Sequence, residues 1–119
     1  MARRFLVVAG LAVALLIPAT ADAASLTLKW SSLASSITPG SYATAVVRTT
    51  AGATCGIVVQ YATTISSAKG LVSKKAPTGG TLSWRWKVGS NTNPGTWRVT
   101  VTCKLGSKSL SIWRTMTIL

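Results

Sequence analysis

Most of this chain alternates apolar and polar side chains with a period of two. The clearest example is the stretch of residues 95–105, in which Trp97, Val99 and Val101 share one parity. Arg98 and three threonines occupy the other parity of the same stretch. Successive side chains of a β-strand point to opposite faces of the sheet, so this pattern predicts a strand with one buried face.

Similar alternation recurs along the chain, and the segments that carry it are separated by turn signals rich in Gly, Pro and Asn. The expected strands cover residues 26–30, 41–50, 54–61, 81–88, 95–105 and 108–119. A short edge strand within residues 69–77 brings the total to about seven. In the last strand the apolar parity is interrupted by Arg114, and a β-bulge near Trp113 and Arg114 would explain this. No sustained helical period follows the N-terminal segment, so we predict an all-β sandwich.

The N-terminal segment has a different pattern. Met-Ala-Arg-Arg is followed by an apolar run over residues 5–17 and by the small-x-small sequence Ala21-Asp22-Ala23. These features are typical of a secretory signal peptide cleaved after Ala23. The alternative is a transmembrane anchor, but the run has 13 residues, and a spanning helix needs about 20. We therefore expect a signal peptide over residues 1–23, no transmembrane segment after cleavage, and one domain over residues 24–119 that is secreted, extracellular or cell-envelope associated.

Cleavage would leave a chain with an extreme charge imbalance. The full sequence contains 13 Lys and Arg residues, one acidic residue and no histidine. Removing Arg3, Arg4 and Asp22 leaves eleven basic residues and no carboxylate side chain. Acid–base catalysis and metal binding both draw on carboxylates, imidazoles or free thiolates. We therefore expect no catalytic residue, no metal and no cofactor, and the protein is not predicted to be an enzyme. The positive charge favours association with anionic partners.

The two cysteines, Cys55 and Cys103, predict one disulfide if the chain is exported. Two free buried thiols are the alternative. In a Greek-key sandwich the third and sixth strands lie side by side and antiparallel. Cys55 begins the third expected strand and Cys103 lies near the end of the sixth, so this strand order brings the two sulfurs together within one sheet.

Several motifs in the chain resemble those of bacterial immunoglobulin-like domains of exported proteins. They are Pro39-Gly40-Ser41-Tyr42-Ala43, Ala53-Thr54-Cys55, Leu82-Ser83-Trp84-Arg85-Trp86-Lys87-Val88-Gly89 and Pro94-Gly95-Thr96-Trp97-Arg98-Val99-Thr100-Val101-Thr102-Cys103. The resemblance covers residues 25–119 and implies an immunoglobulin-like Greek-key sandwich of about seven antiparallel strands. The chain departs from antibody-type domains, in which the disulfide joins the two sheets, because its first cysteine follows the second strand. Membership of such a family implies a fold and does not fix a function.

The tryptophans carry two interpretations. Trp84, Trp86 and Trp97 share the parity of their apolar neighbours, which predicts that they belong to the core. The alternative is a stacking platform for sugar rings or bases, which requires at least two exposed tryptophans. Trp113 lies on the opposite parity of its strand and is the best candidate for an exposed one.

Two non-catalytic functions fit these observations. The first is a secreted interaction or structural module with a strongly basic surface that binds a protein partner through loops or a sheet edge. The second is a polyanion-binding protein that holds anionic cell-wall polymer, nucleic acid or acidic lipid headgroups by charge. The candidate polyanion-binding residues are Arg85, Lys87, Arg98 and Trp113.

Overall fold

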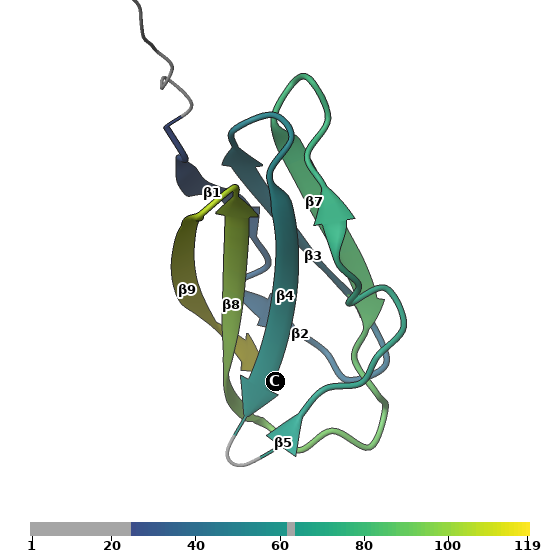
Figure 1. The fold of residues 1–119 in the computed structure, drawn as a ribbon. Helices are drawn as coiled ribbons and strands as arrows, with labels where there is room; N and C mark the ends of the chain where they lie inside the picture. Colours follow the sequence, from purple (N-terminus) through teal and green to yellow (C-terminus); the bar gives the residue numbers. More distant parts are fainter. Residues whose placement is uncertain (1–24, 62–63) are drawn as a thin grey trace, which may run out of the picture.

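The computed structural model describes residues 25–61 and 64–119, and these form nine β-strands in two sheets (Figure 1). Within these residues there is no helix, so none that could cross a membrane. The expected signal peptide, residues 1–23, and its cleavage site lie outside the described residues. The described part is therefore all-β, as the alternating pattern predicts.

One sheet has three strands in the order β1-β3-β7. These strands are β1 (Leu28–Leu33), β3 (Tyr42–Thr49) and β7 (Thr81–Lys87). The other sheet has six strands, with the path β2-β9-β8-β4-β5 and with β6 also paired to β4. Its strands are β2 (Ser36–Ile37), β4 (Thr54–Tyr61), β5 (Thr64–Ile65), β6 (Lys74–Lys75), β8 (Gly95–Leu105) and β9 (Lys108–Ile118).

The buried residues of both sheets form one core cluster, which is consistent with the predicted β-sandwich. In the three-stranded sheet, Ala43 and Ala45 of β3 lie directly opposite Trp86 and Trp84 of β7, and all four side chains are buried. Small residues on one strand thus leave room for indole rings on the next. Close packing of this kind is the usual state of a protein interior.

The disulfide between Cys55 and Cys103 is present and joins two neighbouring strands of the six-stranded sheet. The two residues are paired directly across β4 and β8, and their Cα atoms are 4.0 Å apart. Both side chains are fully buried. The prediction of a bridge within one sheet is therefore confirmed, and no described cysteine is free.

The short strands are the main difference from the sequence prediction. Five of the six long strands match their expected bounds to within one residue, but the first runs over Leu28–Leu33 and contains an irregularity between Trp30 and Ser32. The segment after it, for which no strand was expected, contains β2, which pairs in parallel with the end of β9. The expected edge strand within residues 69–77 is reduced to β6, and β5 was not predicted.

The predicted β-bulge near Trp113 and Arg114 is wrong. The pairing of β8 with β9 runs without a shift from Gly95 and Ile118 to Leu105 and Lys108. Arg114 therefore keeps the parity of the buried Met116 but remains exposed, and its guanidinium carbon lies 5.8 Å from the ring centroid of Trp30 on β1.

Candidate functional site

The four predicted polyanion-binding residues do not share one face. Arg85 and Lys87 are exposed on β7, in the three-stranded sheet, whereas Arg98 and Trp113 are exposed on β8 and β9, in the six-stranded sheet. The strand neighbours of Arg85, Lys87 and Arg98 are buried in the core, and Ile112 beside Trp113 packs against that core. The structure therefore places two of the residues on one outer face and two on the opposite one.

The outer face of the three-stranded sheet carries four basic residues and one exposed tyrosine. We call this surface the basic face, and it consists of Lys29, Tyr42, Arg48, Arg85 and Lys87. Lys29 of β1 lies directly opposite Arg48 of β3, and Tyr42 lies directly opposite Lys87. The guanidinium carbon of Arg85 is 3.9 Å from the ring centroid of Tyr42, which is a diagonal cross-strand contact.

The outer face of the six-stranded sheet is rich in hydroxyl groups and less charged. We call it the hydroxyl face, and it consists of Thr54, Val58, Gln60, Lys75, Arg98, Thr100, Thr102, Lys104, Ser109, Ser111, Trp113 and Thr115. Thr102 and Ser111 are cross-strand partners whose hydroxyl oxygens are 2.7 Å apart. Lys75 and Lys104 flank Thr54 in one row of this face.

Arg98 and Trp113 form the aromatic contact of the hydroxyl face. The guanidinium carbon of Arg98 lies 4.2 Å from the ring centroid of Trp113. Trp113 is paired with Thr100, so Arg98 reaches it along the diagonal of the sheet. A guanidinium stacked in this way holds its planar fork near the surface, where its N–H groups remain available to an anion.

Three of the other tryptophans belong to the interior, whereas Trp30 on β1 is partly buried. Trp84, Trp86 and Trp97 are at most 3% exposed, which confirms that they are core residues. The Nε1 of Trp84 donates a hydrogen bond to the carbonyl oxygen of Val72 at 2.8 Å. Trp113 is 55% exposed and is the one large exposed indole among the described residues. The requirement for a stacking platform of two exposed tryptophans is therefore not met there.

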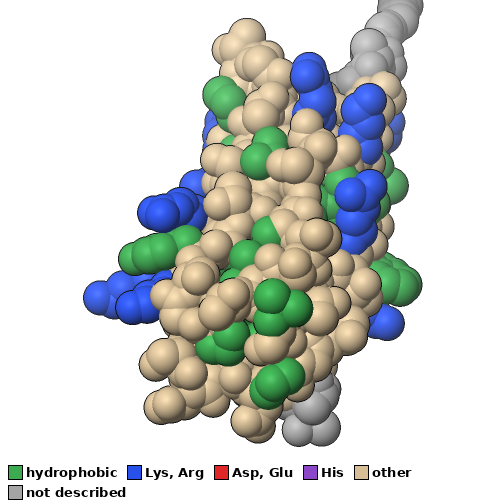
Figure 2. All heavy atoms as spheres, turned by 180° about the vertical axis from the view of Figure 1, so that it is seen from behind, with side chains coloured by type: hydrophobic (Ala, Val, Ile, Leu, Met, Phe, Trp, Pro, Cys, Tyr) green, Lys and Arg blue, Asp and Glu red, His purple; other side chains and the backbone are tan. Residues whose placement is uncertain are grey.

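Lys and Arg side chains protrude from both flanks of the molecule in Figure 2, and no acidic side chain appears in that view. The sequence from residue 25 onward contains eleven basic residues and no Asp or Glu. Sequence analysis did not select Tyr42 or Lys75 as site residues. The alternation of residues 41–50 places Tyr42 on the outward parity, so that signal was available. A short edge strand was expected within residues 69–77, but its pairing with β4, which places Lys75 beside Thr54, does not follow from parity.

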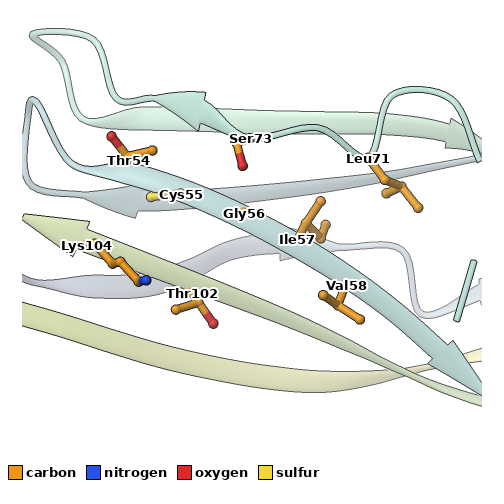
Figure 3. A pocket seen from close by; sticks show the side chains of 9 residues that line it. All are labelled: Thr54, Cys55, Gly56, Ile57, Val58, Leu71, Ser73, Thr102 and Lys104. Carbon is orange, nitrogen blue, oxygen red and sulfur yellow. The ribbon is translucent and has the colours of Figure 1, made fainter. Parts of the chain in front are cut away.

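A groove runs beside β4 (Figure 3) and has a volume of about 460 Å³. Its walls come from β4 and β8 and from Leu71 and Ser73 of the segment before β6. The hydroxyl groups of Thr54, Ser73 and Thr102 point in different directions, so the polar groups do not converge on one point (Figure 3). This arrangement offers no nucleophile and base pair of the kind that hydrolytic catalysis uses.

The groove exists because β4 has partners on this side only at its two ends. β6 pairs with Thr54 and Cys55, and β5 pairs with Gln60 and Tyr61. Between β5 and β6 the chain crosses to β7, where the carbonyl oxygen of Val72 accepts the hydrogen bond from Trp84. Lys74, the first residue of β6, also contacts β7, because its Nζ donates a hydrogen bond to the carbonyl oxygen of Ser83 at 2.6 Å. Gly70 lies so close to the backbone of Arg85 that a Cβ atom would overlap its carbonyl oxygen.

Comparison with known proteins does not identify the site. No protein-family model matches the chain, and a search of curated proteins finds no match. Within residues 25–61 and 64–119 there is no group of three or more His, Cys, Asp or Glu residues that could hold a metal ion.

Proposed function

We propose that this protein is an exported, non-catalytic binding module of the immunoglobulin-like class, and that its basic face binds polyanions. A Greek-key order is supported by two pairings between strands that are far apart in sequence, β3 with β7 and β4 with β8. The path of the first strands also supports it, since β1 pairs in one sheet and β2 in the other. The buried disulfide is consistent with export.

The observation that carries the binding proposal is the set of unneutralised cations on the basic face. Lys29 and Arg48 are direct cross-strand neighbours, a placement of like charges that destabilises a sheet. The sequence after residue 24 has no carboxylate side chain that could neutralise them. A bound polyanion would replace this repulsion with attraction, so the face favours a ligand with repeated negative charges.

The ligand class follows from the type of contact. Lys and Arg side chains on a sheet face can contact phosphate, sulfate or carboxylate groups, and such contacts carry no base information. Arg85 is held against Tyr42, and its fork can donate two parallel hydrogen bonds to an anionic group. We infer that an anionic cell-envelope polymer is the natural partner and that duplex DNA is a convenient substitute with little sequence preference.

A salt series with duplex DNA tests this proposal. If all four cations of the basic face neutralise phosphates, the slope of log affinity against log salt concentration is about −3.6. The variant Arg85→Gln/Lys87→Gln should reduce the magnitude of that slope by about 1.8. The variant Lys69→Gln/Arg114→Gln removes one lysine and one arginine elsewhere and is the matched control, so its slope should stay near that of the wild type.

Two results would contradict the proposal. One is an absence of binding at low salt, where electrostatic attraction is strongest. The other is binding that persists unchanged at high salt, which would indicate an apolar or stacking contact. In that case Trp113, as the large exposed indole, is the first residue to substitute.

A protein partner is the second candidate, and the open part of the β4 edge favours it. Residues 56–58 have no strand partner on the side of the groove, whereas the carbonyl oxygen of Val59 already accepts a hydrogen bond from the backbone N–H of Ser66 at 2.8 Å. An open edge of this kind can accept an extended peptide as an added strand. A peptide library screened against the oxidised protein should then yield binders that protect the amide of Ile57 from hydrogen exchange. Binders that map only to the basic face would reject this candidate.

A further inference from the structure

We infer that one molecule of this protein bridges two polyanion chains, one on the basic face and one on the hydroxyl face. This inference rests on the proposed polyanion binding and extends it from one binding surface to two. Its basis is the distribution of the basic residues over two opposite faces, which the strand register determines.

The eleven basic residues after residue 24 fall into three sets. The basic face carries four of them, namely Lys29, Arg48, Arg85 and Lys87. The hydroxyl face carries three, namely Lys75, Arg98 and Lys104. The remaining four lie outside both faces, toward sheet edges or turns, and they are Lys69, Lys74, Lys108 and Arg114. Neither face contains a carboxylate side chain. Each face therefore carries positive side chains and none of opposite charge.

The two faces are built on the same contact. On the basic face Arg85 lies over the ring of Tyr42 at 3.9 Å, and on the hydroxyl face Arg98 lies over Trp113 at 4.2 Å. Both are diagonal pairs of neighbouring antiparallel strands. Stacking restricts the guanidinium before a ligand arrives, so less conformational freedom is lost when it pairs with phosphate, sulfate or carboxylate.

The distance between the faces makes them separate sites. Two packed sheets are about 10 Å apart, and the outward side chains add to that separation. Surface potentials are screened over about 8 Å at physiological ionic strength. A flexible polymer can wrap around a sheet edge and occupy both faces, but duplex DNA has a persistence length of about 50 nm. A short duplex therefore occupies one face, and a second duplex is needed to occupy the other.

A capture assay with short duplex DNA tests the inference. One duplex is immobilised on beads, the protein is added and the excess is washed away, and a second, fluorescent duplex is then offered at low salt. The wild-type protein should retain the fluorescent duplex on the beads. Beads without protein measure the background.

Two variants with equal charge separate bridging from net charge. Lys75→Gln/Arg98→Gln/Lys104→Gln removes the cations of the hydroxyl face, and Lys69→Gln/Lys108→Gln/Arg114→Gln removes two lysines and one arginine from the edges. The first variant should still bind the immobilised duplex through the basic face, but it should capture at least about tenfold less of the second duplex, because linked binding is lost when one of two sites is removed. The edge variant should capture like the wild type.

Equal capture of the second duplex by the two variants, whether at the wild-type level or equally reduced, would overturn the inference, because bridging would then follow from net charge or from self-association of the protein. A wild-type protein that binds the immobilised duplex but captures no second duplex refutes bridging and leaves the proposed function intact. A wild-type protein that binds no duplex at all refutes the proposed function instead.

Discussion

The disulfide between Cys55 and Cys103 should contribute a large share of the stability of this domain. It links residues 48 positions apart, and it joins the two central strands β4 and β8. Both side chains are fully buried among the core residues. The proposed perturbation is Cys55→Ala/Cys103→Val, which removes the bond and keeps the combined side-chain volume of the pair nearly constant.

The magnitude follows from the length of the closed loop. For a separation of 48 residues, the chain-entropy treatment gives about 4 kcal/mol of destabilisation of the unfolded state. A domain of this size has a total free energy of unfolding of about 5–14 kcal/mol. The bond would then account for at least about a quarter of it, and its loss should lower the melting temperature by at least about 16 °C.

Urea unfolding of the oxidised wild type and of the double variant, followed by tryptophan fluorescence, measures the difference. Wild type reduced after unfolding and refolded under reducing conditions gives an independent value, since its side chains are otherwise unchanged. Because the bond has no exposed surface, a reductant should reach it only when the protein opens. A difference below about 1 kcal/mol in both comparisons would refute the chain-entropy reasoning.

Three further predictions test other parts of the molecule. Gly80→Ala should cost about 1–3 kcal/mol of folding free energy, because Gly80 has a φ of 76° and a Cβ there would overlap the carbonyl oxygen of Thr49, whereas Gly79→Ala, beside open space, should be nearly neutral in the same urea assay. Polyanion affinity should be nearly flat between about pH 5 and 8, since the sequence after residue 24 has no histidine or carboxylate side chain; a steep change in a pH series would contradict this. The intact mass of the exported protein should match a chain whose first residue is Ala24, and retention of residues 5–17 in a membrane fraction would contradict cleavage.

The long strands could be predicted because burial on one side imposes a period of two. In β8 the predicted and observed bounds coincide, from Gly95 to Leu105. The expected Greek-key strand order located the disulfide, because it places β4 beside β8 and brings the two cysteines opposite each other. Local pattern and topology agree at these positions, which is what makes a fold predictable from sequence.

Of the two-residue strands, β6 lies within the segment where a short edge strand was expected, but β2 and β5 could not be predicted from a pattern. Periodicity needs several residues, and β2, β5 and β6 have two each. Their existence depends on long-range partners, such as the end of β9 beside Ser36 and Ile37. Sequence parity places Arg114 on the inward side of its strand, but it does not reveal that the side chain remains exposed beside Trp30.

The prediction of the candidate site was wrong for a different reason. Parity correctly indicated that Arg85, Lys87, Arg98 and Trp113 point outward, but parity does not say to which sheet a strand belongs. The strand order used for the disulfide would have separated the strand of Arg85 from that of Arg98, because a Greek-key sandwich places them in opposite sheets. The split between the two faces was therefore available from the sequence and was missed.

The absence of acidic side chains after residue 24 connects the stability of this protein with its proposed function. Eleven like charges on a small domain repel one another, and this self-repulsion lowers the stability of the compact state. The core offsets that cost through features that do not depend on charge, namely the buried indoles of Trp84 and Trp86 and the buried disulfide. An anionic partner that binds only the folded state adds stability by mass action and also removes part of the repulsion. In the proposed complex, the surface charge that costs stability in the free protein would therefore become favourable.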